Sequence, residues 1–246
     1  MSSPTPAQPS SAAPLSLTER RKAETRMEIA RAAAGLFVKH GLRATRAEDI
    51  AQAAGIAPRT FYRYFATKEE AVAPLYAAGA QRWAEAVREA PAELSVAEAL
   101  EHAVRRTLTP GAGVSAASWE WVRTLIRLAE SSPALRKVWA EVCQGAERML
   151  AGVLGERTES QGAGTADNVA EPSTPTPTPT PAPPLVSADL RFAAAVASAA
   201  VRTAVEAWAA GDAPAGGERG PAGLALRNLG VVGGFPWEGG AGAGAA

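Results

Sequence analysis

The chain has 246 residues and 25 basic and 25 acidic side chains, so its formal net charge is zero. Its single cysteine, Cys143, excludes an internal disulfide framework and any multi-cysteine metal site. With only two histidines, His40 and His102, we expect no metal site and no cofactor. No run of about 18 apolar residues is present to span a membrane, and residues 1–16 lack the pattern of a secretory signal. We therefore expect a cytoplasmic protein without a membrane partner.

Composition separates structured from unstructured parts of the chain. Residues 1–16 offer almost nothing to bury, and we expect a disordered tail. Residues 158–186 are expected to form one long disordered loop around the Pro-Thr repeat at 172–184, where proline favours an extended spacer. A PxxP-type ligand is the alternative interpretation of the repeat, but no basic anchor residue flanks it. Residues 233–246 are expected to be a flexible tail.

Between these segments the apolar residues recur at helical spacing. The first helix is expected over residues 20–40 and ends at Gly41. Further helices are expected over 115–131, from Pro133 onward, and over 188–210. Alternating β-branched runs with turn dipeptides between them are absent. The sequence therefore predicts an all-α protein.

The zero net charge conceals an asymmetry along the chain. Residues 17–70 carry eleven basic and seven acidic side chains, a net charge of +4, and the remainder carries −4. A basic segment on an acidic body favours a polyanionic partner for that segment alone. An ordinary fluctuation in composition is the alternative interpretation.

Residues 45–65 have the pattern of two short helices joined by a glycine turn. Thr45 and Glu48 have the spacing of a capping box at the start of the first helix. Gly55 suits a tight turn, and Pro58 suits the first position of the next helix. This pattern is typical of a DNA-binding helix-turn-helix, whose second helix enters the major groove. A small helical hairpin with polar outer residues is the alternative.

The second of these helices has one apolar and one polar side. Phe61 and Phe65 are four residues apart and are expected to pack inward. Arg59 and Arg63 share another face, and a guanidinium can form two hydrogen bonds with guanine. The outward-facing side chains therefore have suitable chemistry for DNA.

The stretch from Thr25 to Val72 resembles the N-terminal domain of the TetR family of bacterial transcriptional regulators. The shared positions are Phe37, Gly41, Thr45, Asp49, Ile50, Ala51, Ala54, Gly55, Thr60, Tyr62, Tyr64, Phe65, Lys68 and Glu69. The form PRTFYRYF followed by TKE resembles members common in high-GC actinobacteria. The resemblance implies a DNA-binding domain over residues 17–66, with its motif at about 46–65.

The resemblance also implies which residues contact DNA. They are Thr45, Arg46, Ala57, Pro58, Arg59, Thr60, Tyr62, Arg63, Tyr64 and Lys68. Thr45 would cap the second helix and contact phosphate, Lys68 would contact phosphate, and Arg63 would reach bases or nearby phosphate. Two positions depart from the family pattern. Ala57 replaces a frequent Ser, at a cost of about 1 kcal/mol in helix capping, and Arg46 replaces a frequent Thr or Ser.

In the family, the part that follows binds a small-molecule effector and forms a homodimer, which here implies residues 67–232. The candidate pocket residues are Trp83, Trp119, Trp121 and Trp139, with an ordinary core as the alternative. Four charged residues at helical spacing, Glu120, Arg123, Arg127 and Glu130, are expected to form a solvated, self-paired stripe. Cys143 is expected to be a buried, inert thiol.

The final long helix is apolar on two sides, as in a helix with core on one side and a partner subunit on the other. The candidate interface residues are Phe192, Val196, Ala199, Val201, Val205 and Trp208. A central helix within a monomer is the alternative.

The patterns predict a sequence-specific DNA-binding protein, and the resemblance implies an effector-released dimeric repressor at a palindromic operator of double-stranded DNA. The alternative is a DNA-binding protein without an effector, either constitutive or architectural. An enzyme would need a nucleophile–base pair, paired carboxylates or metal ligands. Since no such set is found, no catalytic residue is assigned.

Overall fold

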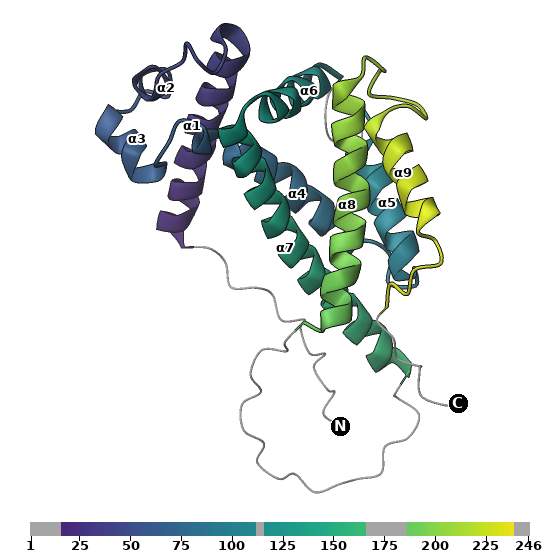
Figure 1. Cartoon of the computed structure of the whole chain (residues 1–246). Coiled ribbons are helices and arrows are strands. Elements are labelled where there is room, and N and C mark those ends of the chain that lie inside the picture. Colours follow the sequence, from purple (N-terminus) through teal and green to yellow (C-terminus); the bar gives the residue numbers. More distant parts are fainter. Residues whose placement is uncertain (1–15, 112–115, 166–185, 239–246) are drawn as a thin grey trace, which may run out of the picture.

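A computed structural model describes residues 16–111, 116–165 and 186–238, and these residues form helices and no strand (Figure 1). The predicted all-α fold is confirmed. The helices are α1 (Leu17–His40), α2 (Ala47–Ala53), α3 (Pro58–Tyr64), the 3-10 turn η1 (Glu70–Val72), α4 (Ala73–Arg88), α5 (Val96–Leu108), α6 (Ala116–Ser131), α7 (Pro133–Thr165), α8 (Ala188–Ala210) and α9 (Pro221–Val231). Within the described ranges, no helix is both long and apolar enough to cross a membrane.

Helices α1, α2 and α3 form a separate lobe at one end of the molecule (Figure 1). Gly41 ends α1 with a φ of 81°, and its N–H donates to the Phe37 carbonyl, as the glycine in the sequence predicts. Gly55, with a φ of 68°, makes the turn between α2 and α3. Ile50 and Phe61 are fully buried where these helices meet. The lobe thus closes around these buried side chains.

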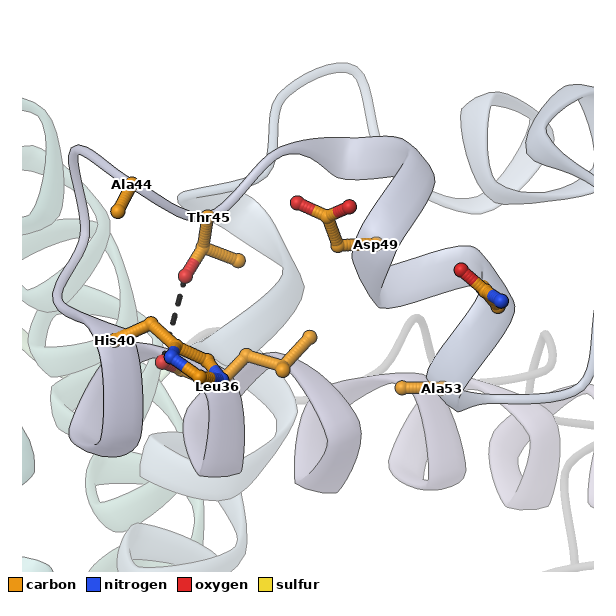
Figure 2. Close-up of a pocket in the computed structure, with 7 residues that line it drawn as sticks. Leu36, His40, Ala44, Thr45, Asp49 and Ala53 are labelled. Atoms are coloured by element: carbon orange, nitrogen blue, oxygen red, sulfur yellow. Dashed lines mark hydrogen bonds between the residues drawn. The ribbon is translucent and has the colours of Figure 1, made fainter.

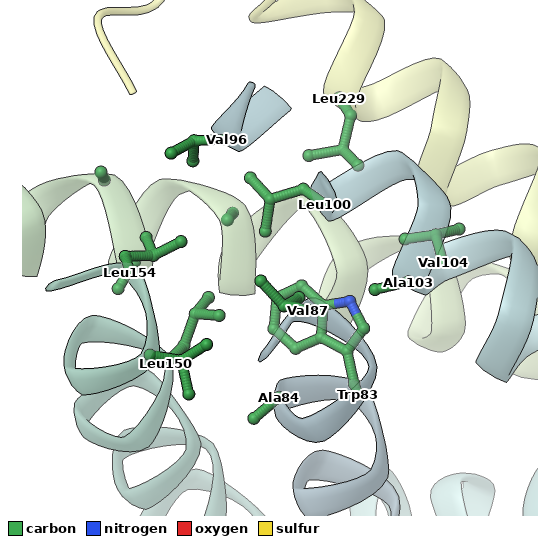
Figure 3. Close-up of a cluster of buried hydrophobic side chains, with 14 of the residues drawn as sticks. Trp83, Ala84, Val87, Val96, Leu100, Ala103, Val104, Leu150, Leu154 and Leu229 are labelled. Carbon is green, nitrogen blue, oxygen red and sulfur yellow. The ribbon is translucent and has the colours of Figure 1, made fainter. Parts of the chain in front are cut away.

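The remaining helices form the body, in which α4 packs on α7, α7 on α8, and α8 on α9 (Figure 1). Figure 3 shows the centre of this packing, where Val87 of α4, Leu100 of α5 and Leu150 of α7 point toward one another, with Leu229 of α9 beside Leu100. All four side chains are buried.

The lobe and the body share one apolar cluster. Ile29 of α1 and Phe61 of α3 belong to the same cluster as Leu125 of α6 and Val138 of α7, and Tyr76 of α4 completes it. The Tyr76 hydroxyl donates to the Leu125 carbonyl at 2.9 Å, and burial raises the pKa of this phenol. The lobe is therefore docked on the body through packed side chains.

Helix α7 is longer than the sequence predicts. Residues 158–165, expected within a loop, continue the helix to Thr165. Two side chains near this end bind the α4–α5 connection: Arg157 donates to the Ala90 carbonyl at 2.8 Å, and Gln161 to the Leu94 carbonyl at 2.9 Å. These contacts stabilise turns that composition alone does not favour. The Pro-Thr repeat lies outside the described residues, as does the N-terminal segment 1–15.

The segment after α9 is packed where a flexible tail was expected. Trp237 is buried, its ring centroid lies 4.8 Å from that of Phe235, and Phe235 in turn contacts Phe192 of α8. Two large aromatic side chains therefore hold residues 233–238 against the body, despite the glycines around them. Residues 239–246 lie outside the described part of the chain.

Candidate nucleic-acid interface and internal cavity

Helix α3 presents a polar outer surface. Ala57 is its N-cap and Pro58 its first residue, in agreement with the sequence pattern. Both are exposed, as are Arg59 and Arg63, and Tyr62 is 52% exposed. A short helix with two free guanidinium groups and a phenol on its outer side has the chemistry to contact DNA.

The inner side of α3 is fixed by a residue that the sequence pattern does not reveal. Arg26 of α1 donates from Nη1 to the Tyr64 carbonyl at 3.0 Å, and its guanidinium carbon lies 4.6 Å from the centre of the Phe65 ring. A cation at a helix C-terminus is favourable. Thr60 and Tyr64 are half-buried, and Arg63 lies over the Tyr64 ring at 5.5 Å.

Thr45 does not have the position expected for it. Its side chain is only 2% exposed, and its hydroxyl donates to carbonyls at the end of α1, that of Gly41 at 2.9 Å and that of Leu36 at 3.4 Å. Figure 2 shows the second of these bonds, in a hollow between α1 and α2. The N-cap of α2 is Arg46, one residue later. The Thr45 hydroxyl thus fastens α1 to the next loop and faces away from solvent.

Arg46 is exposed and lies beside a carboxylate. Its N–H donates to Asp49 at 2.8 Å, and its Nε lies 3.8 Å from Glu48. The same Glu48 accepts a long hydrogen bond of 3.5 Å from the Tyr62 hydroxyl. Glu48 is a residue that the sequence pattern did not assign to this surface. It lies near two expected DNA contacts, Arg46 and Tyr62, and phosphate would compete with it for both.

Lys68 connects the two ends of the motif. Its Nζ donates to the carbonyls of Leu42 and Thr45, both at 2.7 Å, and the side chain is half-buried. These charge-assisted bonds fix the loop before α2 against the turn after α3. The phosphate contact expected for Lys68 stays a prediction, now alongside this structural role.

The body contains a cavity of about 620 Å³ between α4, α6, α7 and α8. Its wall includes all four candidate pocket residues, Trp83, Trp119, Trp121 and Trp139. The Trp139 Nε1 donates to Glu206 at 2.7 Å, and its ring packs edge-on against Tyr76 at 5.0 Å. The volume falls within the range of about 300–1,000 Å³ of small-molecule sites.

Several lining residues carry no signal in the sequence. Arg31 extends to the cavity from α1 in the lobe, and Arg82 from α4. Cys143 also lines the wall, and burial raises the pKa of its thiol to about 11. The thiol therefore stays protonated near neutral pH, as expected for an inert cysteine. Among the described residues, no group of three or more His, Cys, Asp or Glu could hold a metal ion.

Helix α8 separates the candidate interface residues into two sets. Phe192 is 62% exposed, and Val196 and Ala199 are half-buried on its outer side. Val201 and Val205 line the cavity, and Trp208 is 1% exposed. The second set belongs to the interior of the body because it faces α6, where the Trp208 ring packs edge-on against Trp119.

The stripe predicted on α6 is exposed at Glu120, Arg127 and Glu130, and Arg123 pairs with Glu120 at 3.1 Å as expected, but Arg123 itself is not solvated. Arg123 is buried, donates to the Ala213 carbonyl, and lies 4.3 Å from the centre of the Trp208 ring. Arg127 donates to the carbonyls of Ala209 at 2.6 Å and Gly211 at 2.8 Å. Arg127 thus binds carbonyls at the C-terminal end of α8, where a cation is favourable, and Arg123 binds a carbonyl in the α8–α9 connection. Their role is to hold the α8–α9 connection.

A three-helix lobe with an exposed, polar third helix, docked on a hollow helical body, defines a helix-turn-helix DNA-binding protein. Residues 29–73 match the model of the bacterial regulatory proteins of the tetR family. The lobe is therefore a DNA-binding domain of the TetR type.

Two curated relatives match this chain over part of their length. The HTH-type transcriptional regulator TcmR of Streptomyces glaucescens is 29% identical over 143 residues, which cover 57% of this chain and 63% of the relative. The putative mycofactocin biosynthesis transcriptional regulator MftR of Mycobacterium tuberculosis is 47% identical over 49 residues, 20% of this chain and 25% of the relative. The match thus spans less than two thirds of either relative.

Solved structures share the fold over most of the chain. Thermus thermophilus FadR, a TetR-family transcriptional repressor in complex with lauroyl-CoA, has a TM-score of 0.50 at 22% identity, covering 90% of this chain and 98% of that one. A putative TetR-family regulator from Rhodococcus sp. has a TM-score of 0.51 at 17% identity, covering 86% and 97%. At these identities the likeness shows the fold alone.

Proposed function

We propose that this protein is a dimeric repressor that binds a palindromic DNA operator and is released from it by a small molecule. The observation that carries the proposal is the cavity of about 620 Å³, whose wall includes a residue of α1 as well as residues of the body. A molecule bound there contacts the helix that supports the DNA-binding lobe. A constitutive regulator without an effector has no need for such a hollow body.

The dimer is supported by an apolar outer surface on α8 and α9. Phe192 is 62% exposed and Val231 is 81% exposed, and half-buried Val196 and Ala199 continue the surface along α8. A two-fold dimer through this surface would present two α3 helices to two half-sites. A protein that binds chromosomal DNA in a bacterium acts in the cytoplasm, and it needs no catalytic group.

Selection of bound fragments from a random double-stranded DNA library tests operator binding. We expect an enriched inverted repeat whose half-sites lie about one helical turn, or about 10 base pairs, apart. Arg63→Ala should relax base preference at one or two positions of each half-site, whereas Arg227→Ala, an exposed arginine of α9, should not. The absence of an enriched repeat with folded protein would contradict the proposal.

Release by an effector requires reciprocal coupling. A molecule that weakens operator binding must itself bind more weakly to the operator complex, by the same factor. Calorimetric titration of the cavity ligand with and without operator DNA measures this factor. Equal affinities in the two titrations would leave DNA binding intact as a function and refute effector release.

A further inference from the structure

Aromatic side chains make up much of the cavity wall. Trp119 and Trp121 come from α6, Trp139 from α7, and Trp83 and Tyr76 from α4. Of these, Tyr76, Trp83 and Trp119 are buried in the packed body. Flat, rigid walls of this kind favour a flat aromatic ligand, because offset or edge-on ring contacts add to simple apolar burial.

The charges on the wall all have the same sign. Among the described lining residues the charged ones are Arg31, Arg82 and Arg202, and none is Asp or Glu. Arg202 is already paired with Glu206, at 3.3 Å. Arg31 and Arg82 have no carboxylate within 4.0 Å in the described part of the chain. Two positive charges of the wall are thus left uncompensated.

The two uncompensated arginines lie at the solvent side of the cavity. Both side chains belong to exposed residues. On α4, Arg82 follows Leu75 and exposed Gly79 along one edge of the helix, whereas Tyr76 and Trp83 lie on the adjacent, buried stripe. The cavity therefore has an aromatic interior and a cationic edge.

We propose that the ligand of this cavity is an aromatic acid, with its rings among the tryptophans and its anionic group at the edge formed by Arg31 and Arg82. This inference rests on the proposed effector function and names the chemical class of the effector. The guanidinium groups would bind a carboxylate through charge-assisted hydrogen bonds. A neutral aromatic molecule would make the ring contacts of the interior but no ion pair with the arginines. An aliphatic acid would make the ion pair and bury apolar surface but would lack the ring contacts.

Isothermal titration calorimetry of the full chain, without DNA, tests the proposal with three probes. Anthracene-2-carboxylate should bind about fivefold more tightly than anthracene-2-carboxamide, since exposed ion pairs contribute modestly. It should also bind more tightly than dodecanoate. Equal binding of the carboxylate and the amide would overturn the role of the arginines, and tighter binding of dodecanoate would overturn the aromatic class.

Matched variants test which residues cause the preference for the carboxylate. The double variant Arg31→Gln/Arg82→Gln should remove the preference for the carboxylate over the amide and leave amide binding unchanged. Trp121→Leu should weaken both anthracene probes, and Arg227→Gln on α9, outside the cavity, should change neither. A preference that persists in the double variant would refute the assigned edge.

The outcome is separable from that of the proposed function. An enriched operator together with failed carboxylate preference would leave a DNA-binding repressor whose effector belongs to another class. A carboxylate preference without any operator would identify the ligand class and refute the repressor.

Discussion

The DNA-binding lobe and the helical body treat buried polar groups differently. In the lobe, the buried Thr45 hydroxyl is hydrogen-bonded, and no buried side-chain N or O atom of residues 16–72 lacks a partner. In the rest of the described chain six such atoms lack one: Trp83 Nε1, Trp119 Nε1, Arg123 Nε, Arg157 Nε, Ser198 Oγ and Trp237 Nε1. Unpaired buried groups cost free energy. The buried polar groups of the lobe are paired, whereas the body leaves some unpaired, among them Trp83 Nε1, Trp119 Nε1 and Ser198 Oγ of the cavity wall.

Removing one large side chain from each region tests this difference most directly. Phe61→Ala should lower the free energy of unfolding by about 4 kcal/mol, because it empties a filled core. Trp121→Ala removes a half-buried ring from the wall of an existing cavity, and we expect a loss of only about 1 kcal/mol. Urea denaturation followed by circular dichroism measures both. Equal losses would contradict the contrast between a filled lobe and a hollow body.

Lys68 tests the polar side of the comparison. Lys68→Ala removes both carbonyl contacts across the motif and should cost about 2 kcal/mol of stability, or about 4–8 °C in Tm. Operator binding should weaken for all sequences alike. Lys39→Ala, at an exposed position of α1, is the control for loss of charge. An unchanged Tm would mean that these bonds do not stabilise the lobe.

Cys143 reports on the environment of the cavity wall. With its pKa raised to about 11, the folded thiol should react with iodoacetamide at pH 8 at least about tenfold more slowly than in the urea-unfolded chain. The folded state keeps a proton that the unfolded chain releases above about pH 8.5. Stability should therefore fall as the pH rises from there toward 11. Equal alkylation rates in the two states would show that the wall is open to solvent.

The smallest expected effect concerns the start of α3. The Ala57 N-cap provides no side-chain hydrogen bond, and its φ of −70° and ψ of 147° suit a capping serine. Ala57→Ser should stabilise the lobe by about 0.5–1 kcal/mol. A rise of a few degrees in Tm by differential scanning calorimetry would support this, and the matched Ala57→Val variant should give none.

Local signals allowed the sequence to predict the motif. Gly55 and Pro58 specify the turn and the start of α3 through their own backbone preferences. The apolar stripes of α8 likewise predicted that this helix is covered on two sides. The roles of side chains that bind residues far away in the sequence were not predicted. Lys68 binds Leu42, and Arg123 binds the carbonyl of a residue far along the chain, so neighbouring residues contain no trace of either contact.

The cavity illustrates both what the sequence predicts and what it does not. The four tryptophans were candidates because they lie on the predicted middle helices, where aromatic side chains could line a pocket, and all four do line the cavity. Their convergence depends on how α4, α6 and α7 cross, which periodicity does not specify. Arg31 was missed for the same reason, since it belongs to a helix of the other region.

The apolar cluster shared by the lobe and the body bears on how the molecule unfolds. Ile29 and Phe61 of the lobe are buried in the same cluster as Leu125 and Val138 of the body, so opening the lobe alone would expose apolar surface on both sides of the junction. The two regions are therefore expected to melt as one cooperative unit. A molecule that binds the cavity would then slow amide hydrogen exchange in α3 as well as around itself, although it never touches that helix.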